Sequence, residues 1–232
     1  MTPGTLHSAR RARGWTQKRA ARRLGVTQAY LSMLERGRRV PPPPLAQRLA
    51  EVYSLSPLAL PLPGSEWQPG AAAGRGVAAE LERLGYPGTV GGGGRRGAAK
   101  NPAQVLLTAL SQADLDRRLI QALPWLFLRY PAMETSWLAE RARRHDRQNR
   151  LGFIVSLARE VRETRGEPIP PNLADLEAVL ERSRLARFDT LCQSSMSEEE
   201  GRSLYEQRTE AARHWNLLTA LKAEELPYAA RD

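Results

Sequence analysis

The side chains that most often carry out catalysis are few in this sequence, and they are scattered. Its three histidines are His7, His145 and His214, and its single cysteine is Cys192. The adjacent His145 and Asp146 could supply two ligands of a hydrolytic metal site, but further ligands at suitable spacing are not apparent, and one cysteine cannot complete a Cys-rich zinc site. Cys192 and His214 lack the arrangement of a nucleophile and its base. The sequence therefore predicts no enzyme, no metal site and no cofactor.

The single cysteine also bears on the compartment in which the protein works. One cysteine excludes an intramolecular disulfide and fits a reducing cytoplasm. We expect Cys192 to be a buried small residue, with a redox switch as the alternative. The longest apolar stretch, Leu123 to Leu128, is interrupted by Pro124 and is far shorter than the roughly 20 residues that span a bilayer. The N-terminus has no apolar segment typical of a signal peptide. We expect a cytoplasmic protein without a membrane partner.

The positive charge of the chain is concentrated at one end. Residues 1–60 contain eleven Lys and Arg against two acidic residues, a net charge of +9, whereas residues 61–101 carry +2 and residues 102–232 carry −1. Such an asymmetry indicates that the N-terminal part meets a polyanion. Only three of the 35 basic residues are lysines. Arginine suits phosphate binding, although a GC-rich genome would favour it as well.

The middle of the chain has the composition of a connector. Residues 61–101 are rich in Pro, Gly and Ala, which predicts a flexible linker. A short helix from about Gly76 to Leu84 interrupts it. The run Gly91–Gly94 is not a phosphate-binding loop, because no Lys-Ser/Thr pair follows it.

Residues 102–232 have helical spacing of apolar side chains, and we expect a helical bundle there. Expected helix starts are Pro102, Ser111 with Asp114 in a capping box, Ser197 with Glu200 in another, and Asn172. We expect Pro124 and Pro131 to bracket Trp125–Tyr130. Further helices are expected at about 136–144, 147–164 and 209–223. No stretch shows strand alternation, so the whole chain is predicted to be all-α.

Residues 5–60 are predicted to form four short helices with tight turns between them. The residues that cap or end these helices are Gly14, Thr16, Gly25, Thr27 and Gly37. Apolar residues expected to face inward are Leu6, Ala9, Tyr30, Leu31, Leu34, Leu45, Leu49 and Val52. Four prolines, 41–44, leave the start of the fourth helix uncertain.

The second and third of these helices resemble the Cro/C1-type (Xre) helix-turn-helix family, and the resemblance covers about 50 residues. The matching positions are Thr16, Gln17, Ala21, Leu24–Gln28, Leu31, Ser32 and Leu34–Gly37. Ala20 and Trp15 depart from the family, which usually has a larger aliphatic residue at the first position and Leu or Met at the second. The resemblance implies a lambda-repressor-like DNA-binding domain over 1–60.

The resemblance also implies roles for individual residues. The third helix would enter the major groove with its N-terminal residues at base edges; the base readers are Gln28, Ala29 and, one helical turn further along, Met33. Other residues would hold the phosphate backbone; these are Thr16, Gln17, Thr27, Ser32, Arg36, Arg38 and Arg39. Arg10 and Glu35 would form an internal ion pair.

The function implied is that of a transcriptional regulator that binds double-stranded DNA. We predict a repressor that binds a palindromic operator as a homodimer, with residues 102–232 as the oligomerisation or partner-binding domain. The alternative is an antitoxin-like protein that neutralises a toxin or another protein through 102–232 and regulates its own operon through the N-terminal domain.

Overall fold

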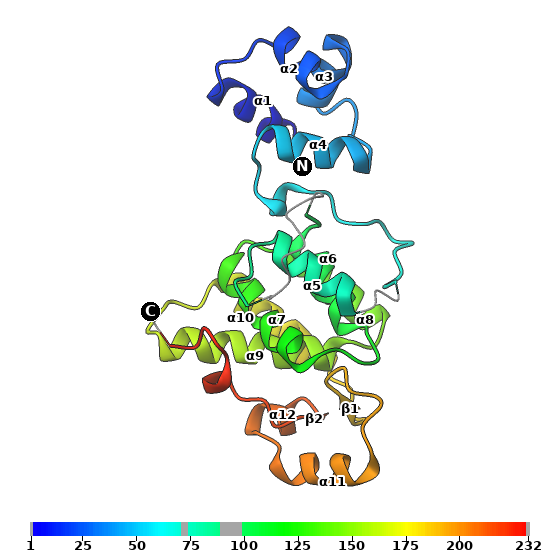
Figure 1. Cartoon of the computed structure of the whole chain (residues 1–232), viewed down its shortest axis with the longest axis vertical. Helices are drawn as coiled ribbons and strands as arrows, with labels where there is room; N and C mark the ends of the chain where they lie inside the picture. Colours follow the sequence, from blue (N-terminus) through cyan, green and yellow to red (C-terminus); the bar gives the residue numbers. More distant parts are fainter. Residues whose placement is uncertain (1, 71–73, 89–98, 231–232) are drawn as a thin grey trace. The chain divides into compact units, whose positions relative to one another are not determined.

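The structure is a computed structural model that describes residues 2–70, 74–88 and 99–230. The chain divides into two compact units, one spanning Met1–Ser65 and Arg95–Asn101 and the other Glu66–Gly94 and Pro102–Asp232. The described residues form twelve α-helices, two short 3-10 helices and two strands of two residues each (Figure 1). The predicted all-α fold is therefore confirmed.

The N-terminal unit consists of four helices and one 3-10 turn: α1 (Pro3–Ala12), α2 (Gln17–Leu24), α3 (Gln28–Glu35), α4 (Pro43–Val52) and η1 (Pro57–Ala59). Its core is built from Leu6, Ala20, Ala21, Leu24, Leu31, Leu34, Leu49 and Tyr53, with Trp15, Tyr30, Leu45 and Val52 packed against it. Burying a leucine side chain contributes about 1.5–3 kcal/mol. The two alanines of α2 leave room for neighbouring helices.

The start of α4 shows how the chain accommodates consecutive prolines. Pro42 is the N-cap, and Pro43 and Pro44 occupy the first turn of the helix. Proline is tolerated there because the first amides of a helix have no intrahelical acceptor and the proline φ is already helical. Asn101, from the distant part of the same unit, donates a 2.9 Å hydrogen bond from Nδ2 to the carbonyl of Leu60.

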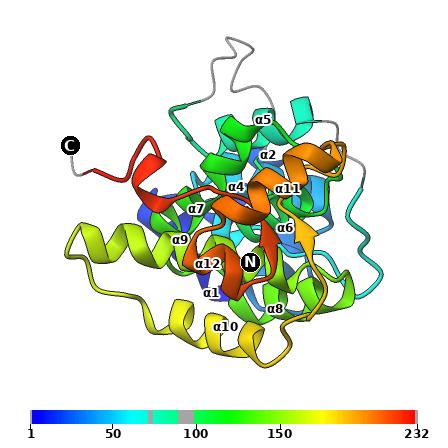
Figure 2. The same ribbon diagram turned by 90° about the horizontal axis from the view of Figure 1, so that it is seen from below.

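The second unit contains α5 (Gly74–Arg83), α6 (Pro102–Leu110), α7 (Arg117–Arg129), α8 (Thr135–Arg144), α9 (Gln148–Thr164), α10 (Pro171–Glu181), α11 (Glu198–Gln207), α12 (Glu210–His214) and η2 (Ala223–Glu225). The long helix α9 is its centre, because α7, α8, α10 and α12 all pack against it. Helices α8 and α10 lie side by side along one edge (Figure 2). Strands β1 (Asp189–Thr190) and β2 (Leu217–Leu218) pair in parallel.

The expected linker differs from the structure over part of its length. Val77, Leu81, Leu84 and Tyr86 are buried, and α5 packs on α6 and α7. The Tyr130 hydroxyl donates a 2.7 Å hydrogen bond to the carbonyl of Leu84. Apolar residues at helical spacing therefore make this segment part of the second core. The four-glycine run lies outside the described residues.

Two predicted helix starts in the second unit are wrong. Ser111 does not cap a helix, because its hydroxyl donates back to the carbonyl of Leu107, and α7 instead begins after Asp116, which accepts from the amide of Arg118. Asn172 does not cap α10, because Pro170 is the N-cap and Asn172 donates to the carbonyl of Pro131. The predicted capping box of Ser197 and Glu200 is present.

Two helix ends also differ from expectation. The final helix ends at His214 rather than near 223, and the chain continues into β2. Helix α7 runs through Pro124 to Arg129. A tyrosine from the far end of the chain supports that continuation: the Tyr228 hydroxyl accepts a 3.0 Å hydrogen bond from the amide of Trp125 and donates one of 2.6 Å to the carbonyl of Gln121. It thereby bridges a helical donor and acceptor beside the proline.

Candidate nucleic-acid interface

The turn between α2 and α3 is defined by two caps and a glycine. The Thr16 hydroxyl accepts a 3.2 Å hydrogen bond from the amide of Arg19, and the Thr27 hydroxyl accepts one of 3.2 Å from the amide of Tyr30. Each cap satisfies an amide at a helix start. Between the helices Gly25 has a φ of 70°, a left-handed conformation that favours glycine. These local signals set the direction in which α3 leaves the turn.

An ion pair then joins the first three helices. Arg10 donates to Glu35 through Nε at 2.6 Å and through Nη2 at 3.0 Å, and the Gln17 amide donates to the same carboxylate at 2.9 Å. Burial of Glu35 opposes its ionisation, but the hydrogen bonds from Arg10 and Gln17 and the charges of Arg10 and His7 outweigh burial and lower the pKa of Glu35. The carboxylate therefore stays charged and holds α1 and α2 on the end of α3.

Helix α3 presents a continuous outward face. Gln28 and Ala29 are exposed, and Ser32 and Met33 are half-buried, whereas Leu31 and Leu34 point into the core. The residues at i, i+1, i+4 and i+5 share one side of a helix. The predicted base readers thus lie together on one face, and Ser32, predicted to bind phosphate, lies among them.

The predicted phosphate-binding residues occupy three places around this face. The hydroxyls of Thr16 and Thr27 accept from backbone amides and still carry a hydrogen to donate. Gln17 is half-buried and its amide is engaged by Glu35, so only part of that side chain is available to a phosphate. The residues after α3, which are Arg36, Arg38 and Arg39, are exposed.

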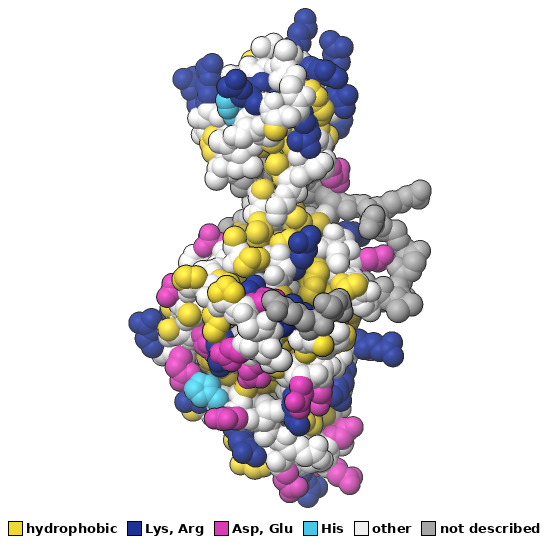
Figure 3. All heavy atoms as spheres, turned by 90° about the vertical axis from the view of Figure 1, so that its left-hand side faces the viewer, with side chains coloured by type: hydrophobic (Ala, Val, Ile, Leu, Met, Phe, Trp, Pro, Cys, Tyr) yellow, Lys and Arg dark blue, Asp and Glu magenta, His cyan; other side chains and the backbone are white. Residues whose placement is uncertain are grey.

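A set of basic residues on α2 forms a surface that the sequence alone did not assign to any site. Lys18, Arg19, Arg22 and Arg23 line, with Thr16, a hollow of about 450 Å³. The space-filling view shows basic side chains spread over the N-terminal unit, at the top of the picture, with few acidic ones among them (Figure 3). The concentration of charge in residues 1–60 was the available signal, but a sum over residues does not say which face carries them.

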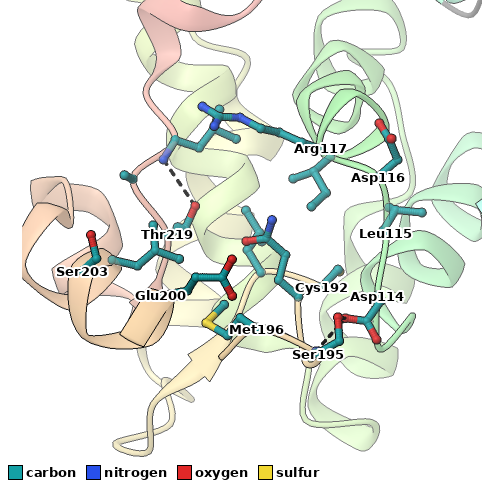
Figure 4. Close-up of a pocket in the computed structure, with 16 residues that line it drawn as sticks. Asp114, Leu115, Asp116, Arg117, Cys192, Ser195, Met196, Glu200, Ser203 and Thr219 are labelled. Carbon is teal, nitrogen blue, oxygen red and sulfur yellow. Dashed lines mark hydrogen bonds between the residues drawn. The ribbon is translucent and has the colours of Figure 1, made fainter. Parts of the chain in front are cut away.

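The second unit has a hollow of its own, of about 700 Å³. Glu200 and Ser203 of α11 stand on one side and Asp116 and Arg117, at the start of α7, on the other (Figure 4). Its carboxylates already have partners: Asp114 accepts from the amide and hydroxyl of Ser195, and Glu200 accepts from the amide of Ser197.

Cys192 is buried beside this hollow. Burial raises the pKa of its thiol more than the charge of the neighbouring Arg150 lowers it. The part of the chain that the structure describes contains no cluster of three or more His, Cys, Asp and Glu residues able to hold a metal ion. No helix in the described ranges is long and apolar enough to cross a membrane.

Comparison with known proteins assigns the N-terminal unit. Residues 6–60 match the family model described as helix-turn-helix. No curated protein and no solved structure matches the chain. The matched segment contains the capped helices, the Gly25 turn and the exposed face of α3. Residues 6–60 are therefore a Cro/C1-type helix-turn-helix domain of the Xre family, and the chain that carries it is a DNA-binding regulator of transcription.

Proposed function

We propose that this protein is a cytoplasmic repressor that binds a palindromic operator as a homodimer. The observation that carries the proposal is the outward face of α3, where Gln28 and Ala29 are exposed next to Ser32 and Met33. In the proposed complex α3 lies in the major groove and Gln28 pairs bidentately with an adenine. Ala29 and Met33 make apolar contacts with base edges, while Thr16, Thr27, Arg36, Arg38 and Arg39 hold phosphates.

The need for two copies follows from how little one copy can read. Among the three proposed base readers only Gln28 can form a bidentate hydrogen bond, and such a pair discriminates by about 1–3 kcal/mol. Arginines on phosphates add affinity but little sequence information. Two copies read two half-sites, which doubles the free energy that separates the operator from other sequences. A two-fold symmetric dimer also fits a palindrome.

The second unit is the proposed dimerisation domain. Residues 102–232 have a net charge of −1, which suits a protein contact better than a second DNA surface. A repressor of this kind acts by occupying the operator. In the antitoxin alternative the same unit binds a different protein instead of a second copy.

The test is selection of bound DNA from a random pool with the full chain, followed by sedimentation of the complex with the selected DNA. We expect an inverted repeat whose half-sites are about 34 Å apart or a multiple of that, bound by two copies. Gln28→Ala should relax preference at one base pair in each half-site. Arg38→Gln, the matched control, should weaken binding to all sequences alike.

Recovery of a single asymmetric half-site bound by one copy would contradict the dimer. Failure to recover any common sequence would contradict specific recognition itself. Repression is tested separately with a reporter gene behind the selected operator, where increased expression would contradict the proposed sign of regulation.

A further inference from the structure

The outer face of α2 consists entirely of basic residues. Ala20, Ala21 and Leu24 face the core, and the opposite side of this eight-residue helix carries Lys18, Arg19, Arg22 and Arg23. All four are exposed. Helix α2 contains no acidic residue, and no ion pair joins any of the four to a carboxylate in the described ranges.

Two features of this arrangement oppose the stability of the helix that carries it, although Arg22 and Arg23 in the last turn suit the helix dipole. Lys18 and Arg22, and likewise Arg19 and Arg23, are like charges four residues apart, which repel on a helix surface. Lys18 and Arg19 also lie in the first turn, where the helix dipole disfavours positive charge. Local choices that conflict with stability concentrate at functional sites. An anion bound along this face would remove both penalties.

The surface is partly preorganised. The Arg23 guanidinium lies 4.6 Å from the centre of the Trp15 ring, and the Arg48 guanidinium donates to the carbonyl of Arg23 at 3.2 Å. Stacking restrains a guanidinium while leaving its edge free to donate hydrogen bonds to an oxyanion. The hollow of about 450 Å³ along the face begins at Thr16, which is also a proposed phosphate-binding residue.

We propose that the outer face of α2 is a second phosphate-binding surface, which holds the DNA backbone flanking the half-site that α3 reads. DNA is the fitting occupant because the face continues from Thr16, at the end of α2 where the operator backbone is already proposed to lie. A duplex bound to α3 therefore brings a polyanion close to these basic side chains. The inference rests on the proposed operator binding and adds to it a stretch of DNA outside the base-read sequence.

The test compares two DNA lengths across a salt series with the full chain. One duplex is the minimal selected operator, and the other carries about one further helical turn, roughly ten base pairs, of unrelated sequence at each end. The variant is Lys18→Gln with Arg22→Gln. The matched control is Arg182→Gln with Arg213→Gln, which makes the same charge change at exposed positions of the second unit.

We expect the flanks to strengthen binding by the wild-type protein and by the control, and to strengthen it less in the α2 variant. On the long duplex the plot of log association constant against log salt concentration should be less steep for the variant than for the wild type, by about 0.9 for each phosphate that the variant no longer neutralises. If the variant neutralises two fewer phosphates, its loss of affinity between about 50 and about 200 mM salt should be about tenfold smaller than that of the wild type. Base preference should stay unchanged, and thermal melting should show an N-terminal unit at least as stable as in the wild type.

Equal binding of long and short duplexes by the wild type would overturn the proposal. An equal reduction in binding by the α2 variant on both lengths would also overturn it, because the basic side chains of α2 would then act only within the operator. These results are separable from failure of the proposed function, since loss of specific recognition appears in the selection experiment and in the response to Gln28→Ala, whatever the flank dependence.

Discussion

The carboxylate of Glu35 receives three hydrogen bonds, two from Arg10 of α1 and one from Gln17 of α2. The side chains of Arg10 and Glu35 are only 11% and 2% exposed. Arg10 also donates to the carbonyl of Trp15 at 2.8 Å, which ties down the segment before α2. A single ion pair thus orients the two helices that place the proposed reading face.

Replacing Glu35 with Gln should destabilise the N-terminal unit by about 3 kcal/mol, because it removes the negatively charged partner of the largely buried Arg10 guanidinium. It should also change the response to acid. The pKa of Glu35 is lowered in the folded protein, so its contribution is present above the unfolded-state value of about 4.3 and is lost as pH falls through the lower folded value. Chemical denaturation at pH 7 and pH 3 measures the free energy of unfolding at each pH. The decrease in that free energy from pH 7 to pH 3 should be smaller in the variant than in the wild type.

The control for this prediction is Glu51→Gln, which changes the other acidic residue of the N-terminal sequence at an exposed position. It should leave the free energy of unfolding at pH 7 within about 0.5 kcal/mol of the wild type. An acid response of Glu35→Gln equal to that of the wild type would contradict the assignment.

At the scale of elements, the helices of the second unit depend on close contacts between segments distant in sequence. A Cβ at Gly152 in α9 would lie 2.4–2.5 Å from the Trp215 ring. Trp215 is 1% exposed, and its Nε1 donates a 2.9 Å hydrogen bond to Ser156 of the same helix. The ring therefore cannot easily move away, and only glycine fits beneath it.

Gly152→Ala should destabilise the second unit by about 1–3 kcal/mol, the usual cost of overpacking, despite the better helix propensity of alanine. Gly201→Ala in α11 is the matched control, since the nearest atom to its Cβ is Met196 Sδ at 3.7 Å. That substitution should stabilise the helix by up to about 1 kcal/mol. Thermal denaturation of the two variants should move in opposite directions, and a parallel shift would contradict the packing argument.

The bridge from Tyr228 to α7 gives a second prediction at this scale. Tyr228→Phe removes a hydroxyl that serves the amide of Trp125 and the carbonyl of Gln121. Leaving these partly buried groups unsatisfied should cost about 1 kcal/mol, and hydrogen exchange of the Trp125 amide should become faster. Tyr205→Phe, at an exposed tyrosine, should change neither quantity.

At the scale of the whole molecule, the two units have separate cores and different charge. Leu31 is fully buried in the N-terminal unit and Leu106 in the second. Residues 1–60 carry the charge of +9, while residues 102–232 are nearly neutral. The proposed division of labour, with DNA on one unit and a second copy on the other, follows this division of charge.

Leu31→Ala should lower the stability of the N-terminal unit by about 2–5 kcal/mol and leave the second unit unchanged, and Leu106→Ala should do the reverse. Hydrogen exchange of the full chain, read peptide by peptide, distinguishes the two. If each substitution increased exchange in both units equally, they would unfold as one cooperative body.

The sequence by itself determined the helix-turn-helix, because its signals are local. Thr16 and Thr27 cap helices through bonds that span three residues, and Gly25 takes a left-handed conformation where the turn needs one. The apolar positions then follow helical spacing, as Leu31 and Leu34 do. Each of these features depends on neighbours within a few residues, so it can be predicted from the order of residues alone.

Only the tertiary structure decided the features that depend on distant contacts. Pro124 ends a helix by local rules, but the Tyr228 hydroxyl serves the neighbouring backbone groups from about a hundred residues further along. Part of the expected linker joins a core because Leu81 and Leu84 find partners there. The burial of Ala20 and Leu24 likewise decides that the four basic residues of α2 share its exposed side. Packing set these outcomes, since burial and satisfied hydrogen bonds outweigh local preference when partners come from elsewhere in the chain.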